Sequence, residues 1–199
     1  MRAVIFDIGD VLERNPRTGW QKRWAERLHL DVHEFERRLD PIWNPGSIGA
    51  ATLADIEGRT GDALGLDPRS VGALMDDAWA EYVGSLNSEL ADHFARLRPR
   101  YRTGILSNSF VGAREREQEA YGFEDMCDAI VYSHEAGYLK PDHRVYHLTC
   151  ERLGVAPEEA VFLDDVQANV DGAREIGMRA ITFATNAQAI AELEACLND

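Results

Sequence analysis

The stretch Ala3-Val-Ile-Phe-Asp-Ile-Gly-Asp-Val-Leu12 is the most informative part of this 199-residue chain. Its four apolar residues, Ala3–Phe6, predict a short, fully buried strand over residues 2–7 that ends in a carboxylate, Asp7. In open α/β sheets, ligands bind just beyond the carboxyl ends of the strands. An acid at such a strand end is well placed to act as a nucleophile or as a metal ligand.

Strands and helices alternate from about residue 87 onward, which is typical of a doubly wound parallel α/β sheet. Residues 15–84 instead predict helices without a convincing strand. We therefore expect an α/β core domain from residues 1–14 and 85–199, with a small helical cap domain, residues 15–84, inserted after the first strand. The expected later strands are 101–107, 128–132, 160–164 and 179–183. The expected helices are 17–29, 31–39, 52–64 and 69–83 in the insertion, and 87–98, 111–121, 142–153, 167–176 and 186–197 in the core.

Polar residues recur in three further motifs along the expected core. They are Ser107 and Asn108 in Gly104–Ser109, Lys140 before Pro141, and Asp164 with Asp165 in Ala160–Asp165. A carboxylate can attack phosphorus, whereas a hydroxyl and a lysine can hold phosphate oxygens. Three carboxylates around one point favour Mg²⁺. Taken singly, each motif has a simpler interpretation as a turn, a helix cap or a solvated side chain.

The four motifs, in this order over nearly the whole chain, resemble those of the haloacid dehalogenase (HAD) superfamily, most of whose members are phosphatases. The resemblance implies a HAD-like Rossmannoid core with a helical cap, and an aspartyl-phosphate mechanism with Asp7 as the nucleophile. It assigns phosphate binding and catalytic support to Ser107 and Lys140. The implied ligands of Mg²⁺ are Asp7, the carbonyl oxygen of Gly9, Asp165 and, through water, Asp164.

Gly9 stands where the usual phosphatase of this superfamily carries an aspartate as general acid and base. Such proton transfer is typically worth roughly 10²–10⁴-fold in rate. The neighbouring Asp10 is displaced by one residue, so its side chain should point elsewhere. The Asp-Xaa-Gly branch includes working sugar-phosphate phosphatases, and the chain is similar in length and cap placement to α-glucose-1-phosphate phosphatase-like enzymes. The sequence leaves open which group donates the proton.

Three further residues are candidates for contacts at the site. Asn108 could assist phosphate binding through its amide or its backbone. Trp43, in an expected turn over Pro41–Gly46, could form a wall of the substrate site, although packing inside the insertion explains it equally well. Asn169 lies one helical turn beyond Asp165 and could reach the same site.

The composition restricts the kinds of partner. The chain carries 35 acidic and 21 basic residues, a formal net charge of −14, which disfavours nucleic acid and anionic membranes. It contains no apolar run of the roughly 18 residues needed to span a membrane, and its start does not resemble a signal peptide. The three cysteines have no metal-type spacing and read as reduced thiols. We expect a cytoplasmic protein of undetermined oligomeric state with a small phosphorylated substrate.

The sequence therefore predicts a Mg²⁺-dependent phosphatase that hydrolyses a small phosphorylated metabolite, such as a sugar phosphate. One alternative is a 2-haloacid dehalogenase, because halide leaves without a proton and that reaction needs no metal. The acidic pair Asp164-Asp165 favours the phosphatase. The other alternative is a non-catalytic phosphate-binding module of the same fold, against which the retained Asp7 and Lys140 argue.

Overall fold

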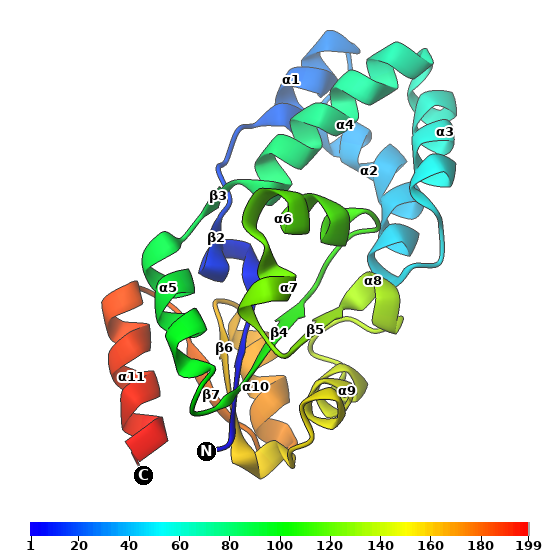
Figure 1. Ribbon diagram of the computed structural model, residues 1–199. Coiled ribbons are helices and arrows are strands. Elements are labelled where there is room, and N and C mark those ends of the chain that lie inside the picture. Colours follow the sequence, from blue (N-terminus) through cyan, green and yellow to red (C-terminus); the bar gives the residue numbers. More distant parts are fainter. Residues whose placement is uncertain (199) are drawn as a thin grey trace.

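A computed structural model describes residues 1–198. The core is a five-stranded parallel sheet with strand order β5-β4-β1-β6-β7, flanked by helices on both faces (Figure 1). The strands are β1 (Ala3–Phe6), β4 (Arg102–Ser107), β5 (Ala129–Tyr132), β6 (Ala160–Asp164) and β7 (Arg179–Thr182). The doubly wound α/β architecture predicted from the sequence is confirmed.

Both faces of β1 are buried, which explains its unbroken apolar sequence. Successive strand residues point to opposite faces, so Val4 and Phe6 pack in one hydrophobic cluster and Ala3 and Ile5 in the other. The first face is covered by α5 (Ser88–Leu97), α7 (Phe123–Met126) and α11 (Asn186–Asn198). The second is covered by α9 (His143–Leu153) and α10 (Gln167–Glu175). The remaining core elements are η1 (Ile8–Leu12), α6 (Ala113–Tyr121), α8 (Ser133–Ala136) and η3 (Pro157–Glu159).

The register of the sheet aligns the ends of its three central strands. Phe6 of β1 is level with Ile105 of β4 and with Leu163 of β6. Because the strands are parallel, the residues that follow Phe6 and Leu163 leave the sheet at the same edge, as does the end of β4. This edge carries the polar residues that the sequence places at strand ends.

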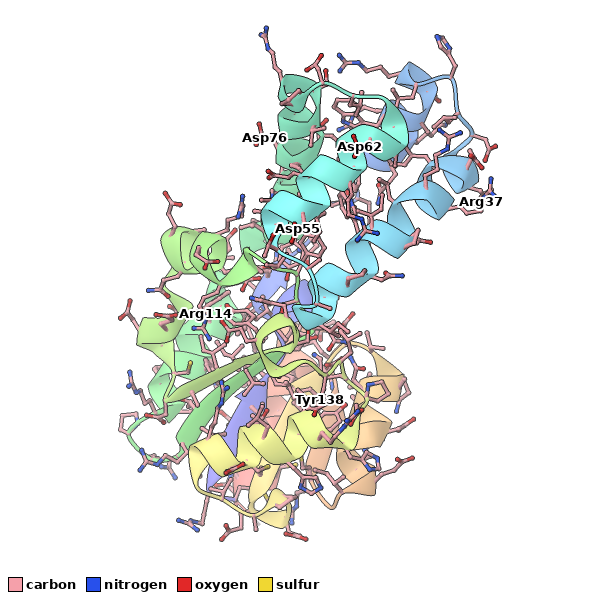
Figure 2. The ribbon with its side chains drawn as sticks, turned by 90° about the vertical axis from the view of Figure 1, so that its right-hand side faces the viewer. Arg37, Asp55, Asp62, Asp76, Arg114 and Tyr138 are labelled. Atoms are coloured by element: carbon pink, nitrogen blue, oxygen red, sulfur yellow. The ribbon has the colours of Figure 1, made fainter. Side chains whose placement is uncertain are left out.

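Four helices form a separate group beyond this edge, here called the helical insert (residues 20–83). They are α1 (Trp20–Arg27), α2 (Val32–Trp43), α3 (Leu53–Leu64) and α4 (Pro68–Val83), with the short turn η2 (Asn44–Ile48) between α2 and α3. The insert has its own apolar cluster around Phe35 and Leu74, while charged residues such as Asp62 and Asp76 lie on its outside (Figure 2). Thr52 and Asp55 form a capping box that fixes the start of α3.

The chain enters and leaves the insert through two short strands that pair antiparallel, β2 (Glu13–Arg14) and β3 (Ser85–Leu86). Tyr121 of α6 steadies the second crossing, because its hydroxyl donates hydrogen bonds to the carbonyl oxygens of Val83 and Gly84. Sequence reasoning missed this ribbon, since two residues per strand give no periodicity to detect.

The predicted break at residues 41–46 is wrong in its position. Helix α2 continues through Pro41 and ends at Trp43, so Trp43 closes a helix rather than sitting in an open turn. Burial of Leu39 and Ile42 in the insert holds this last turn together although Pro41 lacks an N–H group. No helix within residues 1–198 has both the length and the apolar character needed to cross a membrane.

Candidate active site

Asp7 lies directly beyond β1 with only 7% of its surface exposed. Its backbone N–H donates to the carbonyl of Leu163 at 2.9 Å, which extends the sheet by one residue. Its Oδ1 accepts a hydrogen bond from the N–H of Ile8 at 2.8 Å. The carboxylate is thus oriented by its own turn at the sheet edge.

Lys140 links Asp7 to the acidic pair. Its Nζ lies 2.7 Å from Oδ1 of Asp7 and 2.6 Å from Oδ2 of Asp164, and it donates to the carbonyl of Leu106 at 3.1 Å. Although burial lowers the pKa of Lys140, the charges of Asp7 and Asp164 raise it above its usual value. The side chain is therefore a buried ammonium held in one position.

Asp7, Asp164 and Asp165 bring ligand oxygens within 4.8 Å of one another. Burial raises the pKa of Asp7 to about 8 against the opposing Lys140 charge, and burial with the Asp164 charge raises the pKa of Asp165. One ammonium does not balance three carboxylates, so a further cation would stabilise the group. Oxygen donors in this number fit a hard divalent ion such as Mg²⁺.

Asp164 is fully buried and its oxygens are heavily bonded. Besides Lys140, they accept hydrogen bonds from the N–H of Val166 at 2.8 Å and from Nδ2 of Asn169 at 3.0 and 3.1 Å. Asp165 is only half buried and lines the cavity beside Asp7. The two acids of the pair therefore differ, with Asp164 bonded inward and Asp165 facing the cavity.

Ser107 and Asn108 follow β4 at the same edge. Ser107 is 2% exposed and lines the cavity with Asp7 and Lys140. Asn108 uses both ends of its amide on the backbone of Lys140, donating to the carbonyl at 3.1 Å and accepting from the N–H at 2.7 Å. The amide thus fixes the loop that carries Lys140.

Replacing Asn108 by alanine should lower kcat/KM by up to about 30-fold, because two hydrogen bonds that position Lys140 are lost at about 1 kcal/mol each. Asn108→Asp retains the acceptor, but it sets a carboxylate oxygen against the carbonyl of Lys140 and adds a negative charge to the cavity, so it should lose more activity than Asn108→Ala. Steady-state kinetics on both variants check this. Unchanged kinetics in Asn108→Ala would show that Lys140 is held without this clamp.

The candidate residues line a cavity of about 430 Å³ at the sheet edge. Its walls include Asp7, Gly9, Ser107, Lys140 and Asp165. A second cavity of about 310 Å³ adjoins it and shares Glu81, Tyr82 and Asn108 with it. The site therefore has two neighbouring compartments, which are bounded in part by the same three side chains.

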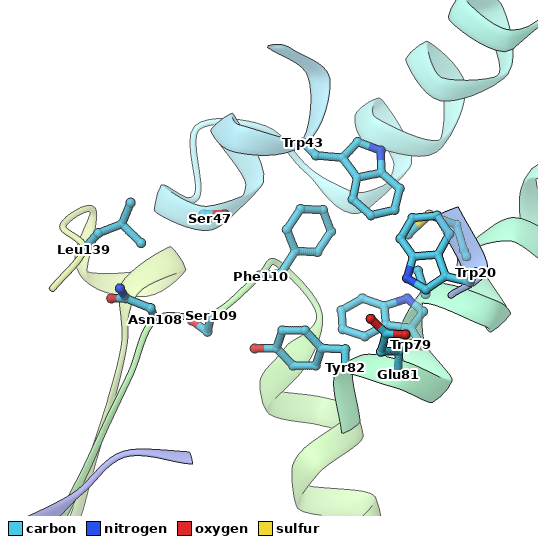
Figure 3. A pocket seen from close by; sticks show the side chains of 12 residues that line it. Trp20, Trp43, Ser47, Trp79, Glu81, Tyr82, Asn108, Ser109, Phe110 and Leu139 are labelled. Atoms are coloured by element: carbon cyan, nitrogen blue, oxygen red, sulfur yellow. The ribbon is translucent and has the colours of Figure 1, made fainter. Parts of the chain in front are cut away.

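The second compartment is mainly apolar and rich in aromatic side chains, and Figure 3 shows Trp43, Phe110 and Tyr82 around it. Trp43 stacks on Trp20 with ring centroids 5.6 Å apart, and its Nε1 donates to Oγ1 of Thr60 at 3.0 Å. With the N–H engaged there, Trp43 offers its ring to the cavity. The structure thus places Trp43 at a wall of the second compartment, away from the carboxylates.

Sequence reasoning did not single out Tyr82, Glu13 and Glu117, which also line the first cavity. The only sequence signal for Glu13 is an acid directly after the apolar pair Val11-Leu12. Glu117 lies in a charged helix segment where nothing marks it as buried. The suggestion that Asn169 reaches the site agrees with its bonds to Asp164.

The parallel sheet and the acidic edge described above are those of a known enzyme class. The chain belongs to the haloacid dehalogenase-like hydrolases, whose family model matches residues 1–177. It is therefore a hydrolase, and the resemblance seen in its motifs is confirmed.

Its relatives include phosphatases. It is 40% identical over 186 residues to phosphatase MT3486 of Mycobacterium tuberculosis, covering 89% of this chain and 85% of that protein. It is 23% identical over 212 residues to D-ribitol-5-phosphate phosphatase of Bacteroides thetaiotaomicron, covering 100% and 99%. It also matches acyl-CoA dehydrogenase family member 10 of mouse at 28% identity over 204 residues, spanning 98% of this chain but only 19% of that protein.

Solved structures show the same fold. A HAD family enzyme of Bacteroides thetaiotaomicron, in complex with magnesium and inorganic phosphate, superposes with a TM-score of 0.78 at 21% identity. The match covers 94% of this chain and 96% of that one.

Proposed function

We propose that this protein is a Mg²⁺-dependent phosphatase that hydrolyses a small phosphorylated metabolite through an aspartyl-phosphate on Asp7. The observation that carries the proposal is the buried contact of 2.7 Å between Asp7 and Lys140, in one cavity with Ser107 and Asp165. A nucleophile, a fixed cation and a hydroxyl donor converge there at the edge of the sheet. Phosphatase MT3486, at 40% identity, supports the same reaction class.

In this mechanism an oxygen of Asp7 bonds to phosphorus as the bond to the leaving oxygen breaks. The hydroxyl of Ser107 and the ammonium of Lys140 donate hydrogen bonds to the phosphate oxygens and offset their charge. Water then hydrolyses the acyl phosphate and returns the Asp7 carboxylate. Asp164 keeps Lys140 in position through its 2.6 Å contact.

The residues that would hold Mg²⁺ are Asp7, the carbonyl of Gly9, Asp165 and, through water, Asp164. When bound, the ion supplies positive charge beside the phosphate. The donor set fits this role, because Asp7, Asp164 and Asp165 place three carboxylates beside one ammonium. A 2-haloacid dehalogenase needs no metal, so its reaction would not require this excess of acidic oxygens.

The helical insert would act as the cap that selects the substrate and excludes water. In this proposal the core is residues 1–14 and 85–199 and the cap is residues 15–84. The phosphate occupies the polar compartment, and its organic group extends along Tyr82 and Asn108 toward Trp43. A sugar phosphate is one kind of substrate that this arrangement could bind.

A screen of phosphorylated metabolites, each assayed with Mg²⁺ and with EDTA, tests the proposal. We expect release of inorganic phosphate from at least one small monoester, and only with Mg²⁺ present. The same plate includes 2-haloacids as a control. Halide release that is insensitive to EDTA, without any phosphate release, would refute the phosphatase and support a dehalogenase.

A further inference from the structure

Gly9 leaves this site without the acid that would protonate a leaving group, and Asp10 does not replace it. Asp10 adopts a left-handed backbone with φ of 52°. Its carboxylate turns to Arg17 at 3.1 Å and accepts a hydrogen bond from the N–H of Asn15 at 3.3 Å. With Asp10 engaged elsewhere, a poor leaving group needs a proton from another group in the cavity or from water.

Five other carboxylates line the cavity with Asp7, namely Asp10, Glu13, Glu81, Glu117 and Asp165. Glu81 accepts hydrogen bonds from the N–H and the hydroxyl of Thr18 at 2.7 and 2.6 Å, and of the five only Glu13 and Glu117 are fully buried. Glu13 lies on β2 with 1% of its surface exposed, and Glu117 lies on α6 with 0% exposed. Oε1 of each is buried and accepts no hydrogen bond from residues 1–198. An ionised carboxylate in this situation is costly, whereas a protonated one is tolerated far better.

Their surroundings supply little positive charge. Arg114, the cation that acts on Glu117, is paired with Glu124 and Glu135 at 2.5 Å each. The other oxygen of Glu117 accepts from the hydroxyl of Tyr132 at 2.5 Å. Two carboxylates thus share a buried site without a cation of their own.

This environment keeps a proton on the pair. Burial, together with the charge of Glu117, raises the pKa of Glu13 to about 10. Burial raises the pKa of Glu117 to about 7. Near neutral pH the pair therefore holds at least one proton, shared between coupled groups.

We infer that the Glu13–Glu117 pair donates the proton to the leaving oxygen, the role that Gly9 leaves vacant. This rests on the proposed phosphatase function. As the bond from Asp7 to phosphorus forms and the phosphorus–oxygen bond breaks, the Glu13 carboxyl passes its proton across the cavity to the departing oxygen, which leaves as an alcohol. In the second step the same carboxylate takes a proton from the attacking water, which restores the acid.

Other titratable and charged groups face this pair and complete its electrostatic setting. They are Asp7 beyond β1, Tyr82 of α4, Arg114 and Tyr121 of α6, and Tyr132 of β5. Burial raises the pKa of Tyr82, Tyr121 and Tyr132 above the usual value, so these phenols stay neutral near neutral pH. Asp7, whose pKa is also raised, is the proposed nucleophile, so the carboxyl pair is the remaining acid of this group that can supply a proton.

Glu13→Gln separates this role from the rest of the chemistry. The test measures single-turnover phosphorylation with 4-nitrophenyl phosphate, whose leaving group needs no proton, and with 2-(4-nitrophenyl)ethyl phosphate, an alkyl ester of similar size. The variant should keep the aryl rate within about threefold and lose about 10²-fold on the alkyl ester. In the wild type the ratio of the alkyl rate to the aryl rate should fall as pH rises through the pKa of the pair, because ionisation of Asp7 affects both esters alike.

Glu119→Gln, an exposed position two residues along α6, is the matched control and should leave both rates unchanged. Glu117→Gln repeats the test should Glu13→Gln fail to fold in a thermal melt. Equal losses on both esters, or no loss on either, would overturn the inference while the phosphatase stands. A wild type that cleaves neither ester nor any metabolite of the screen would instead overturn the phosphatase proposal, and this inference with it.

Discussion

Asp7→Asn is expected to abolish turnover, with kcat lowered by roughly 10⁴-fold or more. An amide is a poor nucleophile toward phosphorus, and no second carboxylate occupies the position directly beyond β1. The fold should persist, because Lys140 keeps Asp164 at 2.6 Å and the carbonyl of Leu106 at 3.1 Å. The loss would therefore be one of chemistry.

Rapid-quench mass spectrometry checks this directly. The wild type should show a transient mass gain of one phosphoryl group, and Asp7→Asn should show none. Asp62→Asn, on the outer surface of α3, is the control for a lost carboxylate and should behave as wild type. A folded Asp7→Asn variant with normal turnover would exclude the aspartyl-phosphate.

Removing the metal should have the next largest effect. EDTA is expected to lower activity by about 10²-fold or more, and MgCl₂ should restore it. Asp165→Ala should lose nearly all activity, because this acid faces the cavity beside Asp7. Asp164→Ala should lose less through the metal but should also melt at a lower temperature, because Lys140 and Asn169 lose a shared buried partner.

Titration of activity against Mg²⁺ concentration separates the two variants. Asp165→Ala should need much more Mg²⁺ for half activation, whereas Asp164→Ala should show mainly reduced stability. Asp171→Ala removes an exposed acid of α10 and is the matched control. Equal activity with and without EDTA would contradict the metal-dependent mechanism.

The sequence predicted the core well because its strands carry local signals. The runs at β1 and β6 are apolar, buried on both faces, and end in acids, so period, length and boundary agree. The capping residues Asp31 and Thr52 likewise mark the starts of α2 and α3. Such features depend on residues that are close together in the chain, so they can be recognised in the sequence.

Contacts between distant elements could not be foreseen in the same way. Glu13 of β2 and Glu117 of α6 are both buried at one cavity, and no local pattern marks either residue as buried. The double hydrogen bond from Asn108 to Lys140 depends on how two loops meet. Burial of Ile42 overrode the proline that predicted a break. In each case contacts between distant parts of the chain, and not local propensity, determined the structure.

The ribbon of β2 and β3 makes the helical insert modular. Arg14 and Ser85 are paired neighbours, so the chain departs from the core and returns to it at almost one point. Any unit whose ends lie about one strand spacing apart, roughly 4.8 Å, could be joined there without moving β1 or the acids behind it. Recombination at these two crossings would exchange as a block the walls that Trp20, Trp43 and Trp79 give to the second compartment, while Asn108 and Phe110 of the core would stay in place.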